Sequence, residues 1–209
     1  MKKILLATTL CLTIAGSAFA TASTEEKKVT FDYKYPVISG LANKDSEANI
    51  NSIIAKKLLS LRKAHAESEY IVSGGMNYKM GTETDKYISF TLQSYDYHGG
   101  AHGMYYTEGF VFDKESGKRL AYTDFVPQLT ASELVRGLRA GAIKGYTADG
   151  NVSGVPFMDN KTRLSKNFVL NKDGSISLIY GPYELDAYAA GNIYVKLTPE
   201  LVQNIKRLR

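Results

Sequence analysis

The chain has 209 residues, of which 44% are hydrophobic and 22% charged, and it contains 15 tyrosines, 8 phenylalanines and no tryptophan. These values are typical of a globular protein with one domain or two small ones. They exclude the disordered, collagen-like and coiled-coil classes, because the compositional biases of those classes are absent.

The first 20 residues are expected to form a secretory signal peptide. Two lysines open the chain, an apolar run follows from Ile4 to Ile14, and Ala18-Phe19-Ala20 is a small-x-small cleavage site. We expect cleavage after Ala20 and a periplasmic or secreted mature protein. No later stretch reaches the length of about 18 apolar residues that a membrane helix needs, so membrane insertion is not expected.

Removal of the leader changes the charge and the cysteine content. The formal net charge falls from +5 to +3, because the leader holds two lysines and no acid. A charge this small does not favour a nucleic acid as partner. Cys11, the only cysteine, lies within the leader, so we expect neither a disulfide nor a cysteine metal site in the mature protein.

The spread of turn signals indicates the domain organisation. Residues 21–28 are small, polar and charged, which predicts a flexible lead-in. After them, no Pro- or Gly-rich linker divides the chain. We therefore expect a single domain over residues 29–209.

Hydrophobic periodicity predicts more strands than helices. The first helix is expected to begin within Asn43–Ser46. The second begins at Thr130 with a capping box, and its apolar stripe extends to Ile143. The third begins at Thr198, with proline in its first turn. The expected strands cover residues 30–37, 70–72, 76–80, 87–93, 104–113, 118–122, 168–170, 175–180 and 193–197.

Turn-forming residues at 113–118 and 171–174 predict hairpins between neighbouring strands. The expected helices lie between blocks of strands. The sequence therefore predicts an α+β fold, with a largely antiparallel sheet, hairpins and about three helices.

The densest polar and aromatic stretch lies between Tyr95 and Tyr106. A metal site would need the imidazoles of His98 and His102 on one ion, but in an extended chain these residues lie about 13 Å apart. We therefore expect no metal ligand and no cofactor. The glycines between the histidines predict a bulge or sharp bend between two strands.

One hypothesis for His102 is acid-base catalysis with Asp96 or Glu108, because histidine titrates near neutral pH. No nucleophile motif accompanies it, since the mature chain has no cysteine and no Gly-x-Ser-x-Gly. We assign no catalytic residue and expect His102 to hydrogen-bond to backbone carbonyls that the bend leaves unpaired. His65, at the polar end of the first helix, is expected to be solvated.

The second conspicuous stretch, Tyr180–Gly191, is rich in tyrosine. Tyrosine combines a large apolar ring with a polar hydroxyl, which suits a recognition surface. The alternative interpretation is that Tyr180 and Tyr183 fill space under a connection between two strands. The sequence does not decide between these two interpretations.

Four segments resemble one family, the RsiV-like extracytoplasmic domain of unknown function 3298 with its companion region of unknown function 4163. The most specific is Gly99-Gly100-Ala101-His102, which matches the family's GGAH motif after a tyrosine-containing strand. The other three, in chain order, are Tyr35–Gly40 with Asn49 and Asn51 in the following helix, Phe112–Phe125, and Tyr183–Gly191. The likeness extends from Val29 to Arg209.

This resemblance implies an exported α+β domain of the bacterial cell envelope. Related domains occur in a lysozyme-binding anti-sigma factor and in the front part of peptidoglycan deacetylases. The resemblance therefore implies a lysozyme-like cell-wall hydrolase or peptidoglycan as the partner. We expect neither anti-sigma signalling nor deacetylation, because the chain shows neither of the segments that perform them.

We predict a non-enzymatic binding domain of the envelope. The alternatives are a hydrolase that uses His102 as acid or base, and an immunity protein against a secreted toxin. The expected binding surface joins the bend to the Tyr180–Tyr188 connection, where two carboxylates form an acidic patch. Its candidate binding residues are Tyr97, His98, His102, Tyr105, Tyr183, Glu184, Asp186 and Tyr188, and its structural motif residues are Gly99, Gly100, Ala101 and Gly191.

Overall fold

The structure is a computed structural model that describes residues 21–27, 31–159 and 161–208. The expected signal peptide, residues 1–20, lies outside them. The helices are α1 (Lys44–Glu67), α2 (Ala131–Arg139) and α3 (Pro199–Arg207), with short 3-10 helices η1 (Tyr122–Asp124) and η2 (Tyr188–Ala190). The strands are β1 (Thr21–Lys27), β2 (Phe31–Val37), β3 (Ser73–Glu83), β4 (Tyr87–Tyr97), β5 (Met104–Asp113), β6 (Gly145–Tyr146), β7 (Val152–Ser153), β8 (Phe168–Leu170), β9 (Ile176–Tyr180) and β10 (Ile193–Leu197).

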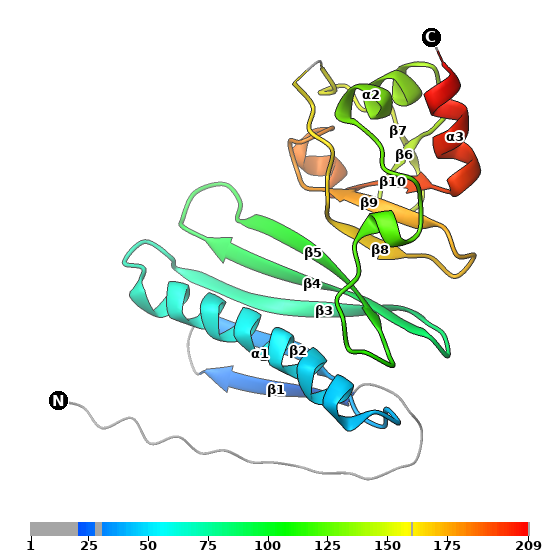
Figure 1. The fold of residues 1–209 in the computed structure, drawn as a ribbon. Coiled ribbons are helices and arrows are strands. Elements are labelled where there is room, and N and C mark those ends of the chain that lie inside the picture. The colour runs from blue at the N-terminus through cyan, green and yellow to red at the C-terminus, as the bar shows by residue number, and fades with distance from the viewer. Residues whose placement is uncertain (1–20, 28–30, 160, 209) are drawn as a thin grey trace, which may run out of the picture.

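The strands form two sheets (Figure 1). The first sheet has the order β1-β2-β3-β4-β5 and the second the order β7-β6-β10-β9-β8. All described pairs are antiparallel except β2 with β3, which are parallel because α1 connects them as a crossover. The predicted α+β fold with three helices and mainly antiparallel pairing is confirmed, although the strands divide between two sheets.

Each sheet has its own hydrophobic core among the described residues. α1 covers one face of the first sheet, and Ile50, Ile54, Phe90 and Phe110 are buried between them. α2 and α3 pack on the second sheet. Val111 belongs to this second core although it lies on β5. Because successive residues of a strand point to opposite faces, β5 contributes to both cores.

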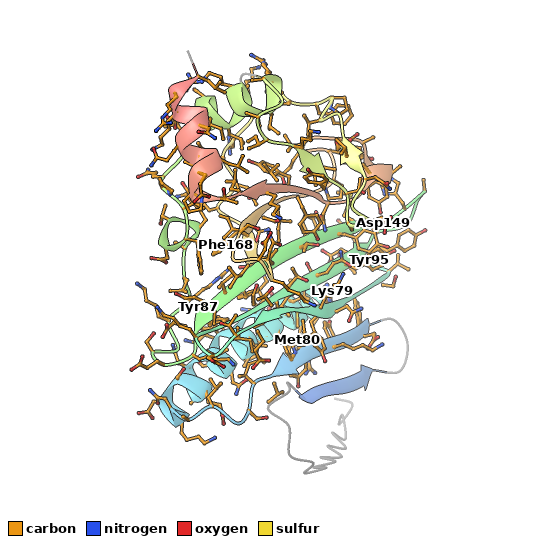
Figure 2. All side chains as sticks on the ribbon, turned by 90° about the vertical axis from the view of Figure 1, so that its right-hand side faces the viewer. Lys79, Met80, Tyr87, Tyr95, Asp149 and Phe168 are labelled. Carbon is orange, nitrogen blue, oxygen red and sulfur yellow. The ribbon has the colours of Figure 1, made fainter. Side chains whose placement is uncertain are left out.

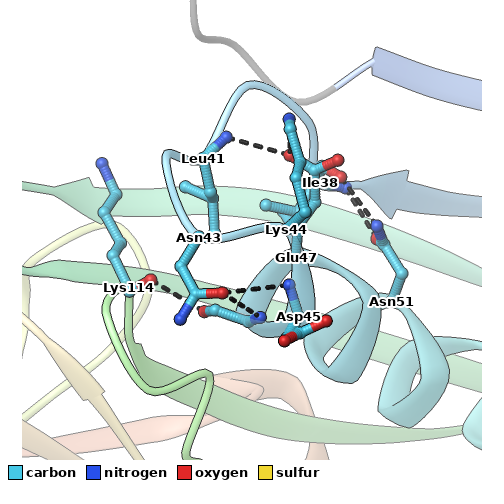
Figure 3. A network of polar contacts seen from close by, with 9 residues as sticks. Ile38, Leu41, Asn43, Lys44, Asp45, Glu47, Asn51 and Lys114 are labelled. Carbon is cyan, nitrogen blue, oxygen red and sulfur yellow. Dashed lines mark hydrogen bonds and ion pairs between the residues drawn. The ribbon is translucent and has the colours of Figure 1, made fainter.

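The start of α1 is fixed by polar side chains (Figure 3). The Asn43 side chain accepts hydrogen bonds from the backbone of the first turn, which makes it the N-cap. Asn51, one of the two asparagines that carry the family resemblance, accepts from the Ile38 amide at 2.8 Å and donates to the Ile38 carbonyl at 2.7 Å. This bidentate contact holds the end of β2 against the helix.

The second helix is shorter than the sequence predicts. Its capping box of Thr130 and Glu133 is confirmed, but α2 ends at Arg139, before the expected Ile143. Gly141 takes a φ of 67°, and the Ala142 amide donates to the Gly137 carbonyl at 3.0 Å. These features define a Schellman motif, in which a glycine in the left-handed conformation ends the helix.

Several strands also differ from the prediction. The described residues of the expected lead-in, Thr21–Lys27, form β1 against the free edge of β2. Residues 118–122 form only an isolated bridge between Arg119 and Phe112 before η1 begins. The expected strands include neither β6 nor β7, because a strand of two residues leaves no periodicity to detect.

The second sheet is attached to the face of the first sheet that α1 leaves free. Asn167, just before β8, accepts from the Gly109 amide and donates to the Thr107 carbonyl, both at 2.6 Å. The Leu170 amide donates to the Ser89 hydroxyl at 3.1 Å.

Among the helices of the described residues, none combines the length and apolarity needed to cross a bilayer.

Candidate functional site

The predicted bend is the loop of the β4–β5 hairpin. Gly99 and Gly100 have φ angles of 86° and 101°, a backbone conformation that side chains other than glycine rarely adopt. The Tyr97 hydroxyl donates to the Gly100 carbonyl at 2.9 Å, across the bend. The glycines of the GGAH motif are thus required by the backbone, while Ala101 lies exposed in the loop.

His102 connects the bend to the Tyr180–Tyr188 connection. Its Nδ1 donates to the Gly103 carbonyl at 2.9 Å, as predicted, and the Tyr188 hydroxyl donates to the same oxygen at 2.7 Å. The His102 and Tyr188 rings are stacked, with centroids 4.0 Å apart. The two conspicuous stretches of the sequence, 85 residues apart at Gly103 and Tyr188, therefore lie side by side.

Five rings gather at this junction, and we call them the aromatic cluster. The ring centroid of Tyr105 lies 4.8 Å from that of Tyr95 and 6.4 Å from that of Tyr188. The ring centroids of Tyr183 and Tyr188 are 5.8 Å apart. Tyr105 is 39% exposed and Tyr183 51% exposed, so the cluster has a solvent-facing side. Its members are Tyr95, His102, Tyr105, Tyr183 and Tyr188.

Tyr183 has an unusual backbone. Its φ is 69°, and the Glu184 amide donates to the Gly181 carbonyl at 3.2 Å. These observations indicate a β-turn in which tyrosine occupies the left-handed position that normally holds glycine. A bulky residue in this conformation is strained, and such strain tends to occur at functional positions.

The expected acidic patch is engaged in local structure. The Glu184 carboxylate accepts a hydrogen bond from the Gly181 amide within its own turn. The Asp186 carboxylate accepts from the Ser153 hydroxyl and from the Ala187 amide. Both carboxylates therefore stabilise the connection.

The other predicted residues lie around the cluster. Gly191, with a φ of 67°, ends η2 directly after the cluster's Tyr188. His98 is exposed in the bend and forms no hydrogen bond or ring contact with the described residues. The structure thus brings together His102, Tyr105, Tyr183 and Tyr188, and leaves His98 apart.

Neither carboxylate proposed as a partner of His102 contacts it. Glu108 pairs with Lys57 at 2.6 Å and with Arg119 at 3.0 Å. Burial alone would raise the pKa of Glu108, but these two cations lower it below its usual value. Asp96 instead lies 2.7 Å from the Nε2 of His65.

His65, predicted to be solvated, is 4% exposed. Because the Asp96 carboxylate can only accept, the His65 Nε2 carries a hydrogen, and the Tyr33 hydroxyl forms a hydrogen bond of 2.6 Å with Nδ1. The prediction was wrong because the helix end that carries His65 lies over β2 and β4. A histidine at a helix end gives no sequence signal for such a contact.

The chemistry available in the aromatic cluster is that of hydrogen bonding and stacking. Burial and the neighbouring Tyr105 raise the pKa of Tyr188, so its hydroxyl is a neutral donor. His102 uses Nδ1 as a donor to the Gly103 carbonyl, and its Nε2 forms no hydrogen bond with the described residues. Within the described part of the chain, no three His, Cys, Asp or Glu side chains are grouped as metal ligands.

A groove leads away from the aromatic cluster between the two sheets. It consists of two cavities of about 580 Å³ and 350 Å³ that share Thr147 and Ala148 of the β6–β7 loop. We call them together the inter-sheet groove. The larger cavity is lined by Lys79, Thr91, Lys172 and Tyr194, among others, and the smaller by Gln93, Tyr105, Asp149, Tyr188 and Asn192.

The floor of the groove is the face of the first sheet that α1 leaves free. On β4, Phe90 and Leu92 belong to the core under α1, so Thr91 and Gln93 point to the other face. Figure 2 shows Asp149 of the β6–β7 loop over the part of the first sheet that carries Tyr95. Sequence periodicity predicts the strands of the floor but not the loop that forms the wall.

Comparison with known families identifies two successive regions. Residues 22–105 match the family model described as "Deacetylase PdaC". Residues 123–199 match the family model described as "Protein of unknown function (DUF3298)". The first region covers most of the first sheet with α1, and the second covers η1, α2 and the strands of the second sheet.

Two solved structures share this fold. A DUF3298 family protein from Pseudomonas aeruginosa is 18% identical and has a TM-score of 0.59, over 88% of this chain and 91% of the other. A DUF3298 family member from Bacteroides fragilis is 16% identical and has a TM-score of 0.51, over 88% and 90%. No curated protein matches the chain significantly.

Taken together, the matches define an α+β protein with a PdaC-type region followed by a DUF3298 region. The match of residues 123–199 to the DUF3298 model agrees with the resemblance that the GGAH segment and the three other segments predicted.

Proposed function

We propose that the protein is an exported, non-enzymatic binding domain of the bacterial cell envelope and that its ligand is peptidoglycan. The observation that supports this proposal is the convergence of the bend and the Tyr180–Tyr188 connection in the aromatic cluster. Exposed tyrosine rings beside hydroxyl and amide groups suit the flat faces and many hydroxyls of a sugar chain. The strained backbone of Tyr183 adds support, because strained residues cluster at binding sites.

A lysozyme-like cell-wall hydrolase is the second candidate ligand. The exposed rings of Tyr105 and Tyr183 favour it, because tyrosine is also enriched in protein interfaces. The engagement of Glu184 and Asp186 in local hydrogen bonds reduces the acidic patch available to a basic partner. Peptidoglycan is therefore the better match.

Binding is tested with the purified chain lacking residues 1–20. It is incubated with insoluble peptidoglycan, and separately with an immobilised lysozyme, at micromolar concentration. We expect the protein to sediment with the peptidoglycan and the amount of insoluble peptidoglycan to stay unchanged. The absence of binding to peptidoglycan would contradict the proposal, and binding to the lysozyme alone would favour the second candidate.

The same incubation tests the hydrolase alternative. A hydrolase that depends on His102 releases soluble fragments, and His102→Ala abolishes this release while the fold persists. A binding domain releases no fragments, and His102→Ala lowers the melting temperature because the Gly103 carbonyl loses one donor. Protection of a host cell from a co-encoded toxin would instead indicate the immunity function.

A further inference from the structure

The inter-sheet groove is long enough for an extended ligand. Lys79 on β3 is paired with Thr91 on β4, and Tyr95 on β4 with Tyr105 on β5. The path from Lys79 to Tyr105 crosses two strand spacings of about 4.8 Å and four residues along a strand, or about 16 Å in all. The groove therefore fits a chain molecule better than a single small metabolite.

The groove presents groups that match sugar hydroxyls. Gln93 and Thr91 lie on its floor, and Thr147 and Tyr194 lie on its opposite wall. Burial raises the pKa of Tyr194, so its hydroxyl stays protonated and able to donate. At the other end of the groove the rings of Tyr105 and Tyr188 offer faces on which a sugar ring stacks.

One wall residue has an unsatisfied acceptor. The Asn192 Nδ2 donates to the Thr107 hydroxyl at 2.7 Å. Its Oδ1 is buried and has no hydrogen-bond partner among the described residues. Buried polar atoms are rarely left unpaired, so a donor supplied from the adjoining smaller cavity would complete the hydrogen bonding of Asn192.

Two lysines give the larger cavity a positive charge. Lys79 and Lys172 both line it, and within the described chain no carboxylate forms an ion pair with either. Asp149 lines only the smaller cavity. This distribution of charged side chains favours a ligand whose negative groups lie in the larger cavity, at the end of the groove that is farther from the aromatic cluster.

We infer that the inter-sheet groove binds an extended glycan chain that carries carboxylate groups. Tyr105 and Tyr188 stack on sugar rings at one end, and Lys79 and Lys172 pair with carboxylates at the other. The inference rests on the proposed function, because the cell envelope supplies such a chain. It adds the location of the chain in the groove and the groups that recognise it.

The test uses glycan strands released from peptidoglycan by an amidase, which lack peptides but keep their carboxylates. They are titrated into ¹⁵N-labelled protein, and amide chemical shifts are followed. We expect the shifts to concentrate in the groove, at Thr91, Gln93, Ala148 and Asn192. The same strands with their carboxylates reduced to alcohols are expected to bind about fivefold more weakly.

Two pairs of variants make the test specific. Lys79→Gln with Lys172→Gln is expected to weaken binding of the carboxylated strands about fivefold and to leave binding of the reduced strands unchanged. The charge-matched control, Lys56→Gln with Lys118→Gln, alters exposed lysines outside the groove. Ala148→Trp fills the junction of the two cavities and is expected to abolish binding, whereas Ala55→Trp on exposed α1 is its control.

The outcomes separate this inference from the proposed function. If intact peptidoglycan binds but glycan strands cause no shifts in the groove, the inference is wrong and the proposed function stands. Shifts in the groove with isolated stem peptides alone would also overturn the glycan assignment. If none of these ligands binds, both proposals fail.

Discussion

Tyr183 shows how one residue can reveal a functional constraint. An L-residue in the left-handed conformation is less stable than glycine there by about 1 kcal/mol, because its Cβ crowds the backbone. The strain occurs here at a ring that is 51% exposed. A strained residue with an exposed ring is a candidate for a functional role.

Two substitutions at this position separate strain from the loss of the ring. Both Tyr183→Gly and Tyr183→Ala remove the ring, but only glycine removes the strain. We expect Tyr183→Gly to have a free energy of unfolding about 1 kcal/mol higher than that of Tyr183→Ala, as measured by urea denaturation. Equal values, or a more stable alanine variant, would show that the position is not strained.

The contact of Tyr33 with His65 is a second prediction at the scale of the residue. Tyr33→Phe removes the hydroxyl that forms a hydrogen bond with the buried His65 Nδ1, so we expect the free energy of unfolding to fall by about 1–2 kcal/mol. Tyr35→Phe is the matched control, since Tyr35 lies on the same face of β2 and forms no hydrogen bond with the described residues. A similar loss in both variants would contradict the assigned network.

At the scale of the element, the β8–β9 turn carries an acid-sensitive contact. A hydrogen bond from Lys196, and to a smaller extent those from Ser175, lower the pKa of Asp173 from 3.8 to about 2. As the pH falls below 4, the unfolded chain therefore takes up a proton before the folded chain does. The stabilisation from this carboxylate is complete above pH 4 and is lost as the pH falls toward 2.

Asp173→Asn tests this contact. The variant is expected to lose less of its free energy of unfolding than the wild type between pH 4 and pH 2, by less than about 1 kcal/mol because the pair is exposed. The measurement is urea denaturation at several pH values in that window. Asp85→Asn, which removes an exposed carboxylate outside any described ion pair, should follow the wild-type pH profile.

The elements also show what a sequence can predict. The capping box of Thr130 and the proline of the third helix are local signals, and both helices begin where these signals place them. The end of α2 depends on the conformation of Gly141, which helical periodicity does not register. Periodicity therefore extended the helix too far.

At the scale of the whole molecule, one asparagine joins the two sheets. Asn167 binds the amide of Gly109 and the carbonyl of Thr107 as a neighbouring strand would, and so occupies the outer edge of β5. Asn167→Asp keeps the acceptor but replaces the donor by a carboxylate that faces a carbonyl. We expect its free energy of unfolding to fall by about 2 kcal/mol, measured by denaturation.

Asn204→Asp, on the exposed side of α3, is the control for that substitution. Its free energy of unfolding should change by less than about 0.5 kcal/mol. Equal effects at the two positions would show that Asn167 does not hold the sheets together.

The expectation of one domain over residues 29–209 stays a prediction, and a single cooperative unfolding transition in the wild type would support it.

The candidate site was predictable in part. The GGAH bend and the Tyr180–Gly191 connection stand out in the sequence, and the structure brings them into contact through His102 and Tyr188. The inter-sheet groove and the Tyr33–His65–Asp96 network were not predictable, because their residues come from segments that only the tertiary fold unites. Single-sequence patterns report on one element at a time.

The central claim is that the aromatic cluster contacts peptidoglycan, and neighbouring tyrosines on β5 test it most directly. Tyr105 points to the cluster, whereas Tyr106, 56% exposed, points to the opposite face of the sheet. The measurement is the dissociation constant for insoluble peptidoglycan, obtained by co-sedimentation of folded variants. The claim predicts about tenfold weaker binding for Tyr105→Ala and an unchanged constant for Tyr106→Ala. Equal constants for the two variants, or stronger loss at Tyr106, would contradict it.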